Sequence, residues 1–137
     1  MEIWQLTATE LKQKIVDGEI SAREATESHL SRMNRLNGKL NAVVESCEVE
    51  ALQEADAVDK KRQKGDKLGA LAGVPVTVKV NVDQKGYATT NGLQLQKDLI
   101  AKTDNPVVKN LRRADAIIIG RTNTPAFSLR WFTRNVI

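Results

Sequence analysis

Gly73-Val74-Pro75-Val76-Thr77-Val78-Lys79-Val80-Asn81 is a run in which every second residue is valine. This alternation predicts a β-strand, because successive side chains of a strand point to opposite faces of its sheet. Both faces suit a buried central strand, apart from the charge on Lys79. Burying an unpaired ammonium group is costly, so this lysine must reach water or lose its proton. A lysine without its proton can act as a base, which makes Lys79 the first candidate for chemistry.

A helix and a second strand follow this run. Asn105-Pro106 starts the helix, with proline at its first position. Its apolar stripe includes Val107, Val108 and Leu111. The next segment, Ala116-Ile117-Ile118-Ile119-Gly120, is the continuous apolar run typical of an interior parallel strand. Strand, helix and strand in this order predict a βαβ crossover and an α/β sheet.

The residues before position 65 predict three helices. Thr7-Ala8-Thr9-Glu10 and Ser21-Ala22-Arg23-Glu24 are capping-box patterns, which start the first two helices. Gly18 is expected to end the first helix, and Asn37-Gly38 the second. The third helix is predicted over about residues 48–63, with small and apolar residues on one face. The sequence therefore predicts an α/β protein in which an N-terminal helical layer precedes the first strands of the sheet.

Composition excludes several classes of protein. The 137 residues suffice for one compact domain, and no apolar run is long enough to predict a membrane span. The net charge is +4, with basic residues gathered between positions 60 and 67 and in a second cluster of Arg121, Arg130 and Arg134. We interpret both clusters as solvated faces rather than nucleic-acid sites, because blocks of charged residues commonly face solvent. The single cysteine, Cys47, cannot form an internal disulfide, so we expect a cytoplasmic location.

Three blocks of the sequence resemble one known family. They are residues 68–79, which end in Val78-Lys79, residues 88–92, Ala88-Thr89-Thr90-Asn91-Gly92, and residues 107–127, which include Gly120-Arg121-Thr122-Asn123-Thr124-Pro125. The blocks occur in the order found in the N-terminal part of amidase signature enzymes. That family includes aryl amidases, indoleacetamide hydrolases, fatty-acid amide hydrolases and the A subunit of the glutamyl-tRNA amidotransferase.

The resemblance extends over nearly the whole chain and is closest in character to stand-alone amidases such as indoleacetamide hydrolases. It implies the mixed sheet of the amidase signature fold. Residues 1–64 would form the helical layer, and residues 65–137 would form the start of the α/β core of an amidase domain.

The resemblance also implies a catalytic role for Lys79. Members of the family use a nucleophilic serine, a second serine in a cis peptide, and a lysine, which Lys79 matches. The lysine takes the proton of the nucleophile through the second serine and returns a proton to the departing amine. Both serines of the family lie downstream in a Gly- and Ser-rich segment. The serines of this chain lack that context; they are Ser21, Ser28, Ser31, Ser46 and Ser128.

This chain is therefore expected to be the N-terminal portion of an amidase, with both serines missing from it. The complete protein would hydrolyse a small-molecule carboxamide to a carboxylate and ammonia, without a metal or an organic cofactor. The chain alone is expected to be inactive, to bind neither membrane nor nucleic acid, and to pair as a homodimer or with a complementing C-terminal chain. Two alternatives stay open: the A subunit of the glutamyl-tRNA amidotransferase, and a non-catalytic truncated interaction module.

Four further residues carry predictions. Asn123 either supports the active-site loops through its amide or forms an ordinary turn after the second strand. Asp115 stands where the family usually has glycine, so a positive φ at this position would strain it. His29 is predicted to be a packed or hydrogen-bonded residue of the second helix, and Cys47 to be unreactive.

Overall fold

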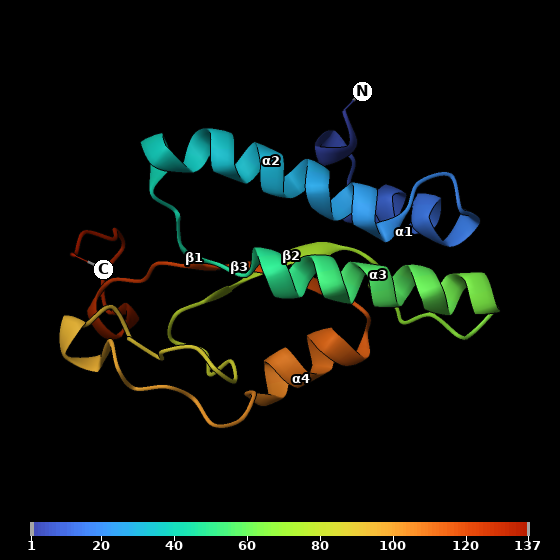
Figure 1. The fold of residues 1–137 in the computed structure, drawn as a ribbon. Helices are drawn as coiled ribbons and strands as arrows, with labels where there is room; N and C mark the ends of the chain where they lie inside the picture. The colour runs from blue at the N-terminus through green and yellow to red at the C-terminus, as the bar shows by residue number, and fades with distance from the viewer. Residues whose placement is uncertain (1, 137) are drawn as a thin grey trace.

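The computed structural model describes residues 2–136 as a small sheet with helices on both faces (Figure 1). The α-helices of this region are α1 (Ala8–Asp17), α2 (Ala22–Leu40), α3 (Glu48–Lys64) and α4 (Pro106–Arg113). Its strands are β1 (Val43–Ser46), β2 (Pro75–Lys79) and β3 (Ile117–Thr122). Short 3-10 helices cover η1 (Ile3–Gln5), η2 (Gln94–Gln96) and η3 (Ala126–Ser128). The predicted α/β fold with an N-terminal helical layer is confirmed.

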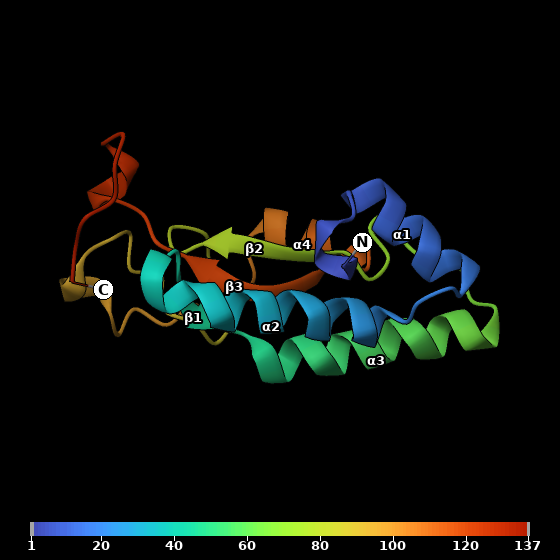
Figure 2. The ribbon, with the colours of Figure 1, turned by 90° about the horizontal axis from the view of Figure 1, so that it is seen from above.

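Two apolar cores fill the space between the layers. Helices α1, α2 and α3 share one core with the sheet, in which Ile15 and Leu30 join Ile117 of β3. Figure 2 shows α2 and α3 running side by side along the sheet, in agreement with their many contacts. Helix α4 covers the opposite face, where Val108 packs with Ile118. The neighbouring residues Ile117 and Ile118 of β3 therefore pack into opposite cores, because successive side chains of a strand point to opposite faces.

The sheet is mixed, as expected, in the order β1-β3-β2. Strands β2 and β3 are parallel and are connected in the chain through α4, which confirms the predicted βαβ crossover. Strand β1 pairs with the other edge of β3 in the antiparallel direction. Within residues 2–136, β2 lies at an edge and β3 is central, so the expectation that the valine strand is central is wrong for this region. Strand β1 was not predicted. Val43-Val44-Glu45-Ser46 has no alternation, and only its pairing with β3 makes it a strand.

The predicted helix starts are confirmed. The hydroxyl of Thr7 accepts a hydrogen bond from the backbone N–H of Glu10 at 3.3 Å, and the hydroxyl of Ser21 accepts one from Glu24 at 3.0 Å. Both glutamates bond back to the capping residue, which completes each capping box. Gly18 ends α1 with a φ of 77°, a left-handed conformation that glycine adopts without strain.

The predicted end of α2 at Asn37-Gly38 is wrong, because the helix is longer. The helix continues through Asn37 and Gly38 to Leu40, and it ends where Asn41 adopts a φ of 49°. Asn37 does not break the helix because its side chain bonds forward to the next strand. Its amide accepts from the N–H of Val43 at 2.9 Å and donates to the carbonyl of Val43 at 2.7 Å.

The second capping box predicts a response to acid. Hydrogen bonds from the backbone N–H of Ser21, and then from its hydroxyl, hold the pKa of the Glu24 carboxyl below its ordinary value. A lowered pKa in the folded state means that this carboxylate stabilises the protein above about pH 4.3, and that the effect is lost as the pH falls through the folded pKa.

We expect Glu24→Gln to melt below the wild type at pH 7. The difference in Tm should shrink by pH 3, because glutamine caps at any pH. Melting followed by circular dichroism tests this, and a Tm difference that grows in acid would contradict it.

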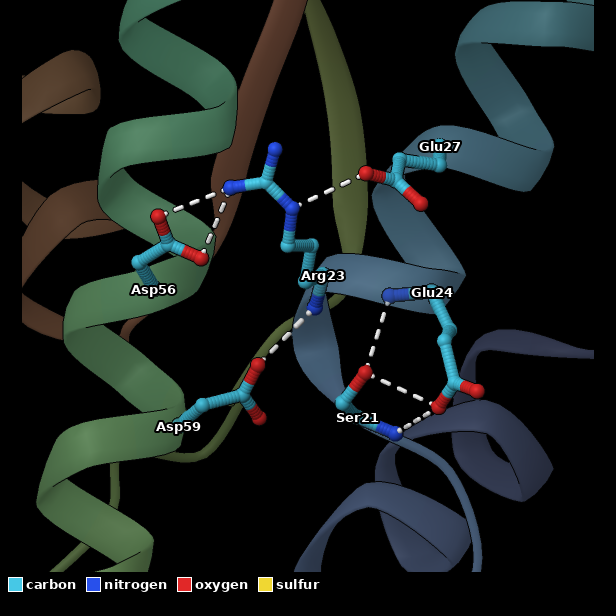
Figure 3. Close-up of polar contacts among 6 residues, drawn as sticks. All are labelled: Ser21, Arg23, Glu24, Glu27, Asp56 and Asp59. Carbon is cyan, nitrogen blue, oxygen red and sulfur yellow. Dashed lines mark hydrogen bonds and ion pairs between the residues drawn. The ribbon is translucent and has the colours of Figure 1, made fainter.

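A buried carboxylate joins α3 to the start of α2 (Figure 3). Asp59 is 9% exposed, and its two oxygens accept hydrogen bonds from the backbone N–H groups of Ala22 at 2.8 Å and Arg23 at 3.0 Å. One turn earlier on α3, Asp56 pairs with the guanidinium of Arg23 at 2.8 Å near the surface. Asp59 therefore satisfies two of the N–H groups that a helix start leaves without intrahelical partners.

The positive φ suspected at Asp115 is present, at 59°. Asp115 is 8% exposed, and one carboxylate oxygen accepts a hydrogen bond from the backbone N–H of Gly69 at 2.7 Å. The other oxygen accepts one from the ammonium group of Lys61 at 2.6 Å. These contacts link the turn before β3 to α3 and to the segment before β2, and they offset the strain that aspartate incurs.

Asp115→Gly tests which of these effects is larger. Glycine would relieve the positive φ but would remove both hydrogen bonds, so we expect a net loss of about 1 kcal/mol in the free energy of unfolding. Asp115→Asn keeps an acceptor for Gly69 and tolerates this conformation, so it should lose less. Urea denaturation measures both variants. A glycine variant more stable than the wild type would show that strain outweighs the bonds.

Candidate functional site

Lys79 is the last residue of β2, and its side chain is exposed. Val78 and Val80 on either side are 6% and 0% exposed, which confirms the predicted alternation. Lys79 pairs in register with Thr122, the last residue of β3. The lysine therefore lies where the carboxyl ends of two parallel strands meet, at the end of the sheet to which both arrows point (Figure 2). Open α/β sheets bind their ligands at this end.

The loops that follow β2 and β3 are bonded to each other at this end of the sheet. Asn81 donates a side-chain hydrogen bond to the Ser128 hydroxyl at 3.1 Å, and the hydroxyls of Ser128 and Thr124 lie 2.7 Å apart. The backbone N–H of Phe127 donates to the carbonyl of Asn91 at 2.8 Å. These contacts place polar side chains from both loops close to the end of β2.

The backbone of these loops is strained. Asn91, Phe127 and Ser128 have positive φ values of 50°, 51° and 60°. Gly92 has a φ of 75° and lies so close to Thr124 that a Cβ at this position would collide with the Thr124 carbonyl. Strained conformations persist only where the surrounding contacts hold them, and they concentrate at functional sites.

Asn123 shows features of both interpretations offered for it. Its side-chain oxygen accepts a hydrogen bond from the N–H of Thr124 at 2.8 Å, as a turn-forming residue would. Its amide nitrogen donates to the side chain of Asn135 at 2.9 Å, and so ties the end of β3 to the C-terminal segment. A role of Asn123 in supporting activity stays a prediction.

Ser128 is the serine that these contacts place at the strand ends. It has no glycine-rich context in the sequence, and only its tertiary contacts reveal its position. Its hydroxyl is engaged with Asn81 and Thr124, and within residues 2–136 it forms no hydrogen bond with Lys79.

Arg121 corrects the interpretation of the second basic cluster. Arg130 and Arg134 are exposed, as expected, but Arg121 on the central strand β3 is 0% exposed. The arginine follows an apolar run and precedes a polar loop, so its residue type and its neighbours favour a solvated strand end. No pattern in the sequence marks Arg121 as buried; the structure shows that the burial of β3 continues through Gly120 to this residue.

Cys47 and His29 lie away from the strand ends. Cys47 is buried and free, and burial raises the pKa of its thiol despite hydrogen bonds from Tyr87 and Gln84, which agrees with the predicted lack of reactivity. The Nδ1 atom of His29 lies 2.8 Å from the carbonyl of Ala25, so the predicted hydrogen-bonded role is confirmed. No cluster of three potential metal-binding side chains occurs in the described part of the chain. Nor does any helix between residues 2 and 136 have the length and apolar character to cross a membrane.

Comparison with known proteins gives a consistent result. The family described as Amidase matches residues 24–137. The indoleacetamide hydrolase of Bradyrhizobium diazoefficiens is 52% identical over 133 residues, which are 97% of this chain and 25% of that protein. The A subunit of the glutamyl-tRNA(Gln) amidotransferase of Streptomyces coelicolor is 40% identical over 134 residues, which are 98% of this chain and 27% of that protein.

A solved structure agrees with these relatives. A bacterial aryl acylamidase of the amidase signature family superposes with a TM-score of 0.83 at 28% identity, over 89% of this chain and 26% of that chain. The present chain thus spans about a quarter of the length of the relatives that it matches. The family match covers most of the chain, and the three resembling blocks and the βαβ unit lie within it. The chain therefore belongs to the amidase family, the amidase signature enzymes.

Proposed function

We propose that this chain supplies the lysine-bearing N-terminal part of an amidase, and that Lys79 is the base of its proton relay. The main support is the place of Lys79, at the carboxyl ends of two parallel strands and beside two interlocked, strained loops. The relay serine and the nucleophilic serine would come from sequence outside these 137 residues, in keeping with relatives about four times as long.

The proposed reaction moves one proton in each direction. The serine oxygen bonds to the carboxamide carbon while its proton passes through the second serine to the neutral Lys79 amine. The same proton then returns to the amide nitrogen, the C–N bond breaks, and ammonia leaves an acyl-serine. Water releases the carboxylate in the reverse sequence. This chemistry requires a neutral Lys79 amine, because only an amine without its extra proton can accept one from the serine.

We further propose an aromatic carboxamide as the substrate. The relative that is 52% identical is named for indoleacetamide, and three exposed aromatic side chains follow the end of β3: Phe127, Trp131 and Phe132. The test is ammonia release by the protein purified from its natural source, with its intact mass measured in parallel. Indole-3-acetamide should be hydrolysed faster than hexanamide or L-glutamine. A purified protein that hydrolyses none of the three would contradict the proposal.

The A subunit of the amidotransferase is the second candidate, supported by the relative that is 40% identical over 98% of the chain. A protein of this kind would co-purify with partner subunits and would release ammonia from L-glutamine in preference to indole-3-acetamide. The same purification and assay therefore separate the two activities. A non-catalytic module would give neither, and would be found at the 15.2 kDa mass of this chain.

A further inference from the structure

Arg121 carries a positive charge inside the protein. The residues around it must compensate the loss of water around that charge. Its side chain is 0% exposed on the central strand β3. Removing a guanidinium from water carries a large penalty, which is offset only where counter-charge and hydrogen-bond acceptors surround it. The identity of those acceptors therefore shows what the arginine holds in place.

The hydrogen-bond acceptors of Arg121 within residues 2–136 all lie in the segment 82–88. One terminal nitrogen donates to the carbonyl of Ala88 at 2.8 Å, and the other lies 3.4 Å from the carbonyl of Val82 and from the side-chain oxygen of Gln84. The guanidinium also faces the ring of Tyr87, at 5.5 Å from its centre. The counter-charge comes from β1, where Glu45 Oε2 lies 2.9 Å from Nε as an ion pair without hydrogen-bond alignment.

The segment that Arg121 holds begins directly after the lysine. The backbone N–H of Val82 donates to the carbonyl of Lys79 at 2.9 Å, so Arg121, Val82 and Lys79 form a continuous chain of hydrogen bonds. Beyond Ala88 the chain turns back, and the N–H of Asn91 lies 3.5 Å from the carbonyl of Val80. Arg121 therefore bonds to both ends of the segment 82–88, in the loop that leaves the end of β2 and returns to it.

The segment 82–88 itself contains no helix or strand. Its outer side bonds to the backbone of residues 99–105. On its inner side Gln84 and Tyr87 contact Cys47, and Arg121 is the group that bonds to the backbone carbonyls of the segment. Two carbonyls six residues apart are held by one planar guanidinium fork. A lysine ammonium is a point charge and cannot reproduce that geometry.

We propose that Arg121 is a positioning residue, which fixes the backbone on the carboxyl side of Lys79 and so sets where the lysine amine points. This inference rests on the proposed function for its catalytic consequence. Its structural part is that the hydrogen bonds of Arg121 to Val82, Gln84 and Ala88, here called the clasp, hold residues 82–88 in place. This part does not depend on the proposed function and can be measured in this chain.

Amide hydrogen exchange on Arg121→Lys tests the clasp. We expect exchange at Val82, Tyr87 and Thr89 to accelerate at least about tenfold, while core amides of α2 such as Leu30 change less than about twofold. Arg130→Lys is the matched control, because Arg130 is exposed in the adjacent loop; it should leave all these rates unchanged. Equal acceleration in α2 and in the segment would show a purely global effect and would overturn the inference, as would no acceleration at Val82.

Two further measurements keep the test decisive. If Arg121→Lys does not fold, the wild-type rates still decide, since an unprotected Val82 amide would mean that the clasp is absent in solution.

In the complete protein, Arg121→Lys should lower kcat for amide hydrolysis about tenfold with KM within about twofold, because small misplacements of a reacting group have effects of this size. Faster exchange with an unchanged kcat would overturn the positioning role. Activity that survives Lys79→Ala would instead refute the proposed function and leave the exchange result valid.

Discussion

Replacing Lys79 with alanine is expected to lower kcat for amide hydrolysis by the complete protein by about 10³-fold or more, the effect of removing a general base. The proposed relay leaves the nucleophilic serine no other group to take its proton. The side chain of Lys79 is exposed and forms no hydrogen bond with other residues of the segment 2–136, so the fold of this region should survive within about 0.5 kcal/mol. Initial rates of ammonia release and a thermal melt of the same sample measure the two effects separately.

Lys79→Arg tests whether Lys79 acts by accepting a proton or through its positive charge. Arginine stays protonated at any accessible pH, so it keeps the positive charge but cannot accept a proton, and this variant should be as inactive as alanine. Lys85→Ala is the control, because Lys85 is an exposed lysine in the loop that follows β2. An arginine variant with near-normal activity would show that Lys79 acts through its charge, and the proposed relay would then be wrong.

Asp59→Ala is expected to be the most damaging single change to stability among the helix contacts. Asp59 is 9% exposed and accepts a hydrogen bond from the backbone N–H of Ala22 at 2.8 Å. It accepts a second from the backbone N–H of Arg23 at 3.0 Å, which Figure 3 shows. Alanine would leave these donors at the buried start of α2 without an acceptor, and each unsatisfied donor costs about 1–3 kcal/mol. We expect a loss of about 2–3 kcal/mol in the free energy of unfolding, measured by urea denaturation.

Asp56→Ala is the matched control on the same face of α3. Asp56 also contacts Arg23, but through its side chain and near the surface, with 42% of the Asp56 side chain exposed. Exposed ion pairs contribute about 0–1 kcal/mol, so this variant should lose much less stability than Asp59→Ala. Equal losses would mean that the interaction between α2 and α3 depends on overall negative charge rather than on the buried cap.

The helices could be predicted because their signals are local. The capping boxes at Thr7 and Ser21 involve residues three positions apart, and the structure contains both. The end of α2 was mispredicted because Asn37 bonds to Val43, a contact that depends on where the next strand lies. Strand β1 was missed for the same reason, since its pairing partner is more than seventy residues away in the sequence.

The candidate site was predictable only in part. Lys79 stands out because a charged residue interrupts an apolar alternation, and its family role comes from the resemblance of the blocks around it. Arg121 was assigned to a solvated cluster, because a list of charges does not reveal that one of them faces Glu45 and the carbonyls of a loop. The aspartate at position 115 was recognised as unusual, but the bonds that stabilise it come from residues 46 and 54 positions away.

The sequence by itself determined the helices, the alternating strand with Lys79 and the family, because periodicity, capping and motif order are properties of neighbouring residues. The tertiary structure alone decided that β3 is central, that Arg121 is buried and that the loops after β2 and β3 interlock beside Lys79. The physical reason is that burial and hydrogen bonding between distant segments depend on which residues the packed chain brings together. A guanidinium or a carboxylate is stable inside the protein only when those distant partners are in place.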